Sequence, residues 1–135
     1  MTFITELTGL GVSPEKAQAL GIDTIASSPS RSSATGLTAT GSAIGDALQL
    51  TAFNSVITTT PLSTGVKLSP LFPVGQLGIV DNRGANPLNL FPPSATERIN
   101  GGTLGAAVTI AAAAVNLVVR VSSTDFVVCV LAKEA

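Results

Sequence analysis

The hydrophobic and polar positions of this chain form short, strand-like runs over most of its length. From Asp46 onward, runs rich in Val, Ile and Thr are interrupted by Gly, Pro and Asn at intervals of about ten residues. This spacing predicts short strands joined by turns: Ala47–Thr51, Ser55–Thr60, Gly65–Leu68, Leu77–Asp81, Leu88–Phe91, Val108–Ala111, Val115–Ser122 and Phe126–Leu131. We therefore predict an all-β domain over residues 46–135, folded as a compact antiparallel sandwich, jelly roll or barrel.

The N-terminal residues have a helical pattern instead. Helical spacing is shared by four apolar residues, Phe3, Ile4, Leu7 and Leu10. A second short helix is predicted where Ser13 can cap the N-terminus, Pro14 fits the first turn and Gly21 can end the helix just after Leu20. Because helices this short are marginal alone, we expect residues 1–26 to form an arm that another surface holds in place.

The segment between the arm and the β domain has the composition of a linker. Residues 27–45 read SSPSRSSATGLTATGSAIG, which is rich in Ser, Thr and Gly and offers little to bury. We therefore predict an extended or flexible connection over this range.

Charged residues are scarce in this chain. Asp, Glu, Lys and Arg make up 11% of its 135 residues, whereas soluble domains typically carry about 25%. A surface with so little charge is poorly suited to stand alone in water, so we expect an obligate oligomer or assembly component. The seven basic residues are scattered singly, which argues against nucleic-acid binding.

Catalytic side chains are also few. The chain has no histidine, and its eight carboxylates are isolated in the sequence, so no common acid–base or nucleophilic arrangement is visible. The single cysteine, Cys129, excludes an internal disulfide and lies in an apolar run that predicts a buried strand position. We therefore expect no enzyme, no cofactor and no metal site.

One uncharged stretch, residues 99–119, is long enough to span a bilayer. It opens with Asn-Gly-Gly, contains Thr109 and Asn116, and ends in a β-branched run. These features favour a pair of strands in a buried sheet over a membrane helix. The strands from Val115 onward are apolar on both faces, which is typical of a sheet covered on both sides.

Asparagines recur around the most polar loop and have two interpretations. A lectin-like site could be built from Asn82, Asn86, Asn89 and Asn100. Asparagine also forms turns, because it hydrogen-bonds nearby backbone and tolerates positive φ. The chain has no Trp or Tyr, the usual sugar platforms, so turn formation is favoured.

Part of the β domain resembles a known family. The stretch GIVDNRGANPLNLFPPSATERINGG contains a strand ending in Val-x-Asn, then Leu-aromatic-Pro-Pro, then Ile-Asn-Gly, at Val80, Asn82, Leu90, Phe91, Pro92, Pro93, Ile99, Asn100 and Gly101. This pattern is similar to a small β domain in virion proteins of tailed bacteriophages and prophages, known as head decoration, cement or head-fibre proteins. The resemblance covers about half of the chain and does not reach the arm.

The resemblance implies a structural role on the outer surface of the capsid. Such proteins are usually homotrimers that bind the major capsid protein and lock neighbouring subunits, or that carry a head fibre. The alternatives are a vertex-spike base and a receptor- or sugar-binding fibre module. The residues that we expect to make contacts are apolar: Phe3, Ile4, Leu7, Leu10 and Leu20 in the arm, and Phe91, Leu117, Val119 and Phe126 in the β domain.

Overall fold

The computed structural model describes residues 32–133, so the helical arm predicted over 1–26 lies outside the described residues. This part of the chain is all-β and contains no helix. Its ten strands are β1 (Ser33–Thr38), β2 (Leu48–Gln49), β3 (Asn54–Thr59), β4 (Gly65–Lys67), β5 (Leu77–Asn82), β6 (Leu88–Phe91), β7 (Arg98–Ile99), β8 (Val108–Ile110), β9 (Ala114–Arg120) and β10 (Asp125–Lys133).

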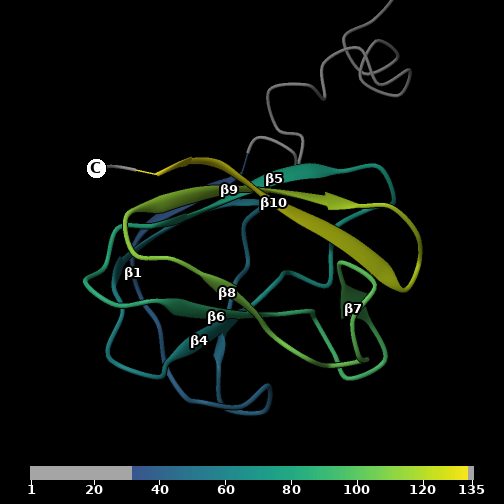
Figure 1. Ribbon diagram of the computed structural model, residues 1–135. Coiled ribbons are helices and arrows are strands. Elements are labelled where there is room, and N and C mark those ends of the chain that lie inside the picture. The colour runs from purple at the N-terminus through teal and green to yellow at the C-terminus, as the bar shows by residue number, and fades with distance from the viewer. Residues whose placement is uncertain (1–31, 134–135) are drawn as a thin grey trace, which may run out of the picture. The chain divides into compact units, whose positions relative to one another are not determined.

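The strands form two sheets that lie one above the other (Figure 1). The larger sheet has six strands in the order β1-β3-β5-β9-β10-β7, and the smaller has four in the order β2-β4-β6-β8. From β1 to β6 the chain alternates between the sheets, placing odd strands in one and even strands in the other. The first six strands therefore wind like the coils of a solenoid.

This winding makes the predicted antiparallel arrangement wrong for the first six strands. The pairs β1–β3, β3–β5, β2–β4 and β4–β6 are all parallel. A strand that returns to its own sheet after a pass through the other sheet runs in its original direction, so it lies parallel to its predecessor. Because a jelly roll is built from antiparallel strands, this feature also excludes that alternative.

Antiparallel strands close the coils on one side. β9 lies antiparallel to β5, and β8 lies antiparallel to β6. β9 and β10 then form an antiparallel hairpin, and the short β7 adds in parallel at the outer edge of β10. The hairpin turn is the predicted Ser122–Asp125 break, where the N–H groups of Val121 and Ser122 donate to the carbonyl of Asp125.

All eight strands predicted from the sequence are present, with bounds shifted by at most two residues. Two others were missed. β7 has only two residues, too few for a periodic signal. β1 lies within residues 27–45, so the linker prediction is wrong from Ser33 onward: a Ser- and Thr-rich segment here pairs with β3 as an exposed edge strand, and the following Ala39 is buried.

The core lies between the two sheets and contains aliphatic side chains from both. Three aromatic rings pack together in it: Phe53 and Phe72 are tilted with centroids 4.6 Å apart, and Phe72 meets Phe126 edge-on at 5.8 Å. The uncharged stretch 99–119 is divided among β7, β8 and β9. No helix among the described residues is long and apolar enough to cross a membrane.

Candidate functional site

An apolar surface covers the outer side of the six-stranded sheet. It is formed by side chains from β5, β9 and β10, and we call it the apolar face: Leu77, Ile79, Val115, Leu117, Val119, Val127 and Cys129. Leu77 is 55% exposed and Val127 is 41% exposed. Cys129 is exposed as well, so the prediction of a buried thiol is wrong.

Strand register places these side chains in rows. Leu77 of β5 is opposite Val119 of β9, which is opposite Val127 of β10. In the next row Ile79, Leu117 and Cys129 are paired in the same way. Residues directly opposite each other point to the same side of a sheet, so each row runs unbroken across the three strands.

The alternate positions on these strands point into the core. Val118 and Phe126 are fully buried, and Val128 is nearly so. Side chains along a strand alternate between its two faces, so apolar residues at every position leave one apolar set outside. The outer set is half-buried or exposed in this single chain, whereas the inner set is already covered by the second sheet.

A polar rim ends the apolar face beside Val115. Asp81 is opposite Val115 in the strand register and accepts a hydrogen bond from Arg83 Nε at 2.7 Å. These residues and Ala113, which has φ of 57°, line a cavity of about 300 Å³. The carboxylate is buried and paired with a guanidinium, so it is not placed as a free acid or base.

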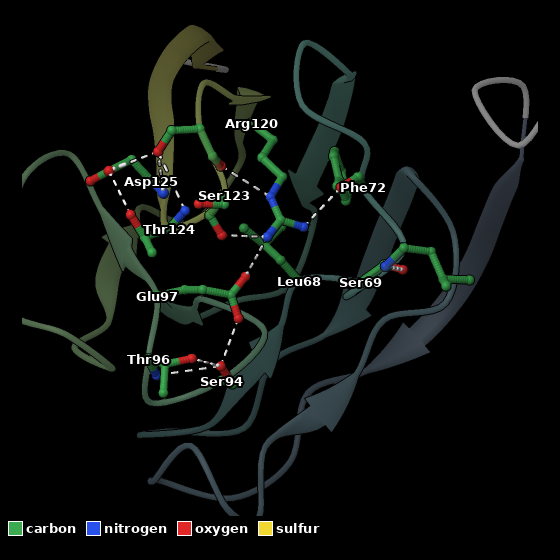
Figure 2. A network of polar contacts seen from close by, with 12 residues as sticks. Leu68, Ser69, Phe72, Ser94, Thr96, Glu97, Arg120, Ser123, Thr124 and Asp125 are labelled. Atoms are coloured by element: carbon green, nitrogen blue, oxygen red, sulfur yellow. Dashed lines mark hydrogen bonds and ion pairs between the residues drawn. The ribbon is translucent and has the colours of Figure 1, made fainter.

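The side chain of Arg120 fixes the end of β9 (Figure 2). Its Nη2 atom lies 3.1 Å from Glu97 Oε2, in an ion pair whose side chains are 14% and 12% exposed. The same guanidinium donates hydrogen bonds to the backbone carbonyls of Phe72, Ser122 and Ser123. One side chain thereby ties the β9–β10 turn to two loops that are distant in the sequence.

Further contacts hold each partner of this pair in place. Glu97 also accepts a hydrogen bond from Ser94 Oγ at 2.6 Å. The Arg120 guanidinium lies 5.1 Å from the centre of the Phe126 ring, within cation–π range. The pair is thus part of a network that holds the hairpin, and with it two of the three strands of the apolar face, in a defined position.

A second charged group stabilises the hairpin turn. Asp125 Oδ1 lies 2.6 Å from Arg98 Nε, and Asp125 Oδ2 accepts hydrogen bonds from the hydroxyls of Ser122 and Thr124. The hydrogen bond from Arg98, followed by those from Ser122 and Thr124, lowers the pKa of the Asp125 carboxyl below its ordinary value of 3.8. All of these donors favour the ionised carboxylate.

The first of the asparagines proposed as a sugar site has a structural role. Asn82 is fully buried. Its Nδ2 donates to the carbonyls of Asn86, Ile110 and Ala111, and its Oδ1 accepts from the N–H of Gly84. The amide therefore closes the turn after β5 and ties it to the end of β8, with no polar atom left for a ligand.

Two other asparagines also bond to the backbone. Asn86 Nδ2 donates to the carbonyl of Thr60. Asn100, at φ of 55°, donates to the carbonyl of Val128 and accepts from its N–H, so its side chain extends the edge of β10. These contacts confirm a turn role for Asn82, and Asn100 adopts the positive φ expected of a turn asparagine, whereas Asn86 bonds to distant backbone.

The structure separates the predicted contact residues into three groups. Leu117 and Val119 lie on the apolar face, half-buried. Phe91 and Phe126 are buried within the chain, and the Phe126 ring packs against Phe72. The arm residues lie outside the described part of the chain, namely Phe3, Ile4, Leu7, Leu10 and Leu20.

Five residues of the apolar face were not predicted individually: Leu77, Ile79, Val115, Val127 and Cys129. A signal for three of them was present, because Val115 alternates with Leu117 and Val119, and the run Phe126–Cys129 is apolar at consecutive positions. Period-2 alternation then requires a second apolar face. For Leu77 and Ile79 the signal was absent, since their place beside β9 depends on strand order.

This arrangement is suited to non-covalent association. Among residues 32–133, no group of three His, Cys, Asp or Glu residues could hold a metal ion. The chain matches no known family model, no curated protein and no solved structure. The apolar face is therefore the feature from which a function has to be argued.

Proposed function

We propose that this chain is a virion structural protein: a capsid decoration (cement) protein that binds the outside of a phage head as a homotrimer and stabilises the shell. The proposal involves no chemical step, cofactor or metal. In it, the β domain, with its two packed sheets, holds the trimer together, and the helical arm expected over residues 1–26 binds the major capsid protein.

The observation that carries the proposal is the apolar face. An uninterrupted apolar surface on an ordered sheet is costly to leave in water, and such surfaces usually mark sites of protein association. The low charge content of the whole chain supports the same reading. Both features are typical of a protein whose surface is covered by other subunits in an assembly.

The particular assembly, a phage head, is supported by the sequence pattern. Most of its residues now have structural roles: Val80 and Leu90 are core residues of β5 and β6, while Asn82 and Asn100 connect distant backbone segments. Pro92 and Pro93 follow the last residue of β6, where neither can donate to a ladder. The pattern thus describes a scaffold and not a catalytic site, which fits a structural family.

Two related alternatives predict a different copy number per particle or a different kind of binding site. A head-fibre or vertex-spike base would be present at far fewer copies than the capsid subunit. A receptor- or sugar-binding fibre module would need free polar groups, and the contacts of Asn82, Asn86 and Asn100 weigh against that site. A glycan array tests this alternative directly. Glycan binding that is abolished by substitutions at Asn82, Asn86 or Asn100 would favour the fibre module.

The test of the proposal is the composition of the particle. In virions of the phage that encodes this chain, quantitative mass spectrometry should find it at about one copy per capsid subunit. A count of a few tens per particle would favour the vertex or fibre-base alternative. Its absence from purified virions would refute a virion role.

The proposed division between arm and β domain has a separate test. Deleting residues 1–26 should leave an oligomeric β domain with the same circular dichroism in the β region, but should abolish binding to expanded heads lacking the protein. Head binding that survives this deletion would assign the capsid contact to the β domain instead.

A further inference from the structure

We infer that the apolar face is the contact between copies of this chain, so that a second copy packs against the outer side of the six-stranded sheet. The inference rests on the proposed function in one respect, because that function requires a homo-oligomer. It adds which of the domain's surfaces forms the subunit contact, and it leaves the other surfaces free for the capsid.

Size gives the first argument. Three strands spaced about 4.8 Å apart, paired over about six residues at about 3.3 Å per residue, make a patch of roughly 300 Å². That is in the range of the largest apolar patches on monomers, many of which are functional. A stable contact needs roughly 800 Å² per partner, so the interface must extend beyond the face.

Exposed apolar side chains continue the patch at two of its edges. Val121, 49% exposed, follows Val119 at the same alternation along the chain, and Leu131, 53% exposed, lies in the irregular part of β10 beyond Cys129. The isolated exposed residues of the loops, such as Leu62 and Leu104, lie on other parts of the chain. Among the described residues, the exposed large apolar side chains that neighbour one another along this sheet and its margins are Leu77, Val121, Val127, Val130 and Leu131.

Charge identifies the occupant. No residue of the apolar face is charged, and two acidic groups near its ends are paired within the chain, Asp81 with Arg83 and Asp125 with Arg98. A nucleic acid or an anionic membrane would require unpaired cations on the surface. An identical uncharged face satisfies the requirement of burying apolar area without desolvating an ion, and a second copy supplies it.

A substitution in the middle of the face tests the contact in the full-length protein. Leu117→Arg places a cation in the central row, and light scattering should show a shift from oligomer to monomer. Leu62→Arg is the matched control, because Leu62 is 76% exposed in the loop between β3 and β4, and this variant should remain oligomeric. The inference is overturned if Leu117→Arg remains oligomeric. It is also overturned if the wild-type protein is still monomeric at 100 times the concentration used for light scattering.

Cys129 provides a second measurement that needs no destabilising variant. The thiol lies in the same row as Ile79 and Leu117. In the wild-type protein, its reaction with a maleimide should slow at least tenfold between dilute and concentrated samples, because a second copy covers it. Equal rates at all concentrations overturn the inference even if Leu117→Arg fails to fold.

The two proposals fail in different ways. If the thiol is protected only on phage heads and the free protein is a monomer, the face binds the capsid: the inference falls and the decoration role stands. If the copies associate through the face but the protein is absent from virions, the decoration role falls and the inference stands.

Discussion

At the scale of single residues, asparagine side chains connect distant backbone segments in this protein. Asn82 closes the turn after β5 and holds the end of β8 from the same position. A fully buried amide is tolerated because each of its polar atoms has a partner. The position requires an amide because it needs both a donor, Nδ2, and an acceptor, Oδ1.

Replacing this amide by a carboxylate should be severe. Asn82→Asp removes the donors that face the carbonyls of Asn86, Ile110 and Ala111, and it buries an uncompensated charge against them. We expect a loss of about 3 kcal/mol or more in the free energy of unfolding. Urea denaturation at neutral pH measures it. Asn89→Asp, at a half-exposed position of β6, is the control and should cost far less.

A carboxylate in the hairpin turn should make stability depend on pH. Because the pKa of Asp125 is lower in the folded chain than its ordinary value of 3.8, the folded state binds fewer protons than the unfolded state in this range. The contribution is fully present above pH 3.8 and is lost as the pH falls through the lower, folded value.

This pH dependence can be assigned with one variant. Urea denaturation of the wild-type protein between pH 5 and pH 2 should show stability falling toward the acid side. Asp125→Asn should reduce the slope of that fall, because the side chain no longer ionises. A variant whose stability has the same slope would show that other carboxylates control the acid limit.

At the scale of elements, the β9–β10 hairpin is held by its ends. Backbone pairing with β5 fixes one side of β9, and the Arg120–Glu97 pair attaches the turn to the loop before β7. The apolar face depends on this attachment, since two of its three strands belong to the hairpin. The Arg120–Glu97 pair, on the side of the sheet opposite the apolar face, therefore helps to hold the strands that carry the face.

Removing one partner of this pair should weaken the whole hairpin. Arg120→Met leaves the poorly exposed Glu97 without its cation and three carbonyls without their donor. We expect a cost of about 3 kcal/mol in the free energy of unfolding. The matched change Arg98→Met affects a more exposed pair, which water screens, so its cost should be clearly smaller. Equal costs in the two variants would contradict a special role for Arg120.

At the scale of the whole molecule, stability and association should be coupled. If copies cover the apolar face, the folded chain is stabilised by its own concentration. A concentration 100-fold above the dissociation constant adds about 2.7 kcal/mol, and each 1 kcal/mol shifts Tm by roughly 4–8 °C for a domain of this size. We expect Tm to rise by roughly 10–20 °C over such a range.

The concentration dependence should vanish when the face is charged. Scanning calorimetry of Leu117→Arg should give one Tm at all concentrations, while Leu62→Arg should behave like the wild-type protein. A Tm independent of concentration in all three proteins would mean that the chain is folded and stable as a monomer.

The sequence alone determined eight of the ten strands and, to within two residues, where they end. The β-branched runs, the prolines after Phe91 and the Ser122–Asp125 turn act locally, through backbone sterics and missing donors, so eight strands could be placed without knowing their neighbours. The turn role of Asn82 and Asn100 was accessible for the same reason.

Only the tertiary structure decided how the strands are combined. Parallel or antiparallel pairing depends on whether the chain crosses to the other sheet between two strands, which no local pattern records. The edge strand β1 exists because β3 offers it partners, and Glu97 meets Arg120 because distant segments fold together. The four-stranded sheet covers one face of the six-stranded sheet, and the apolar face is the side of that sheet which it leaves uncovered.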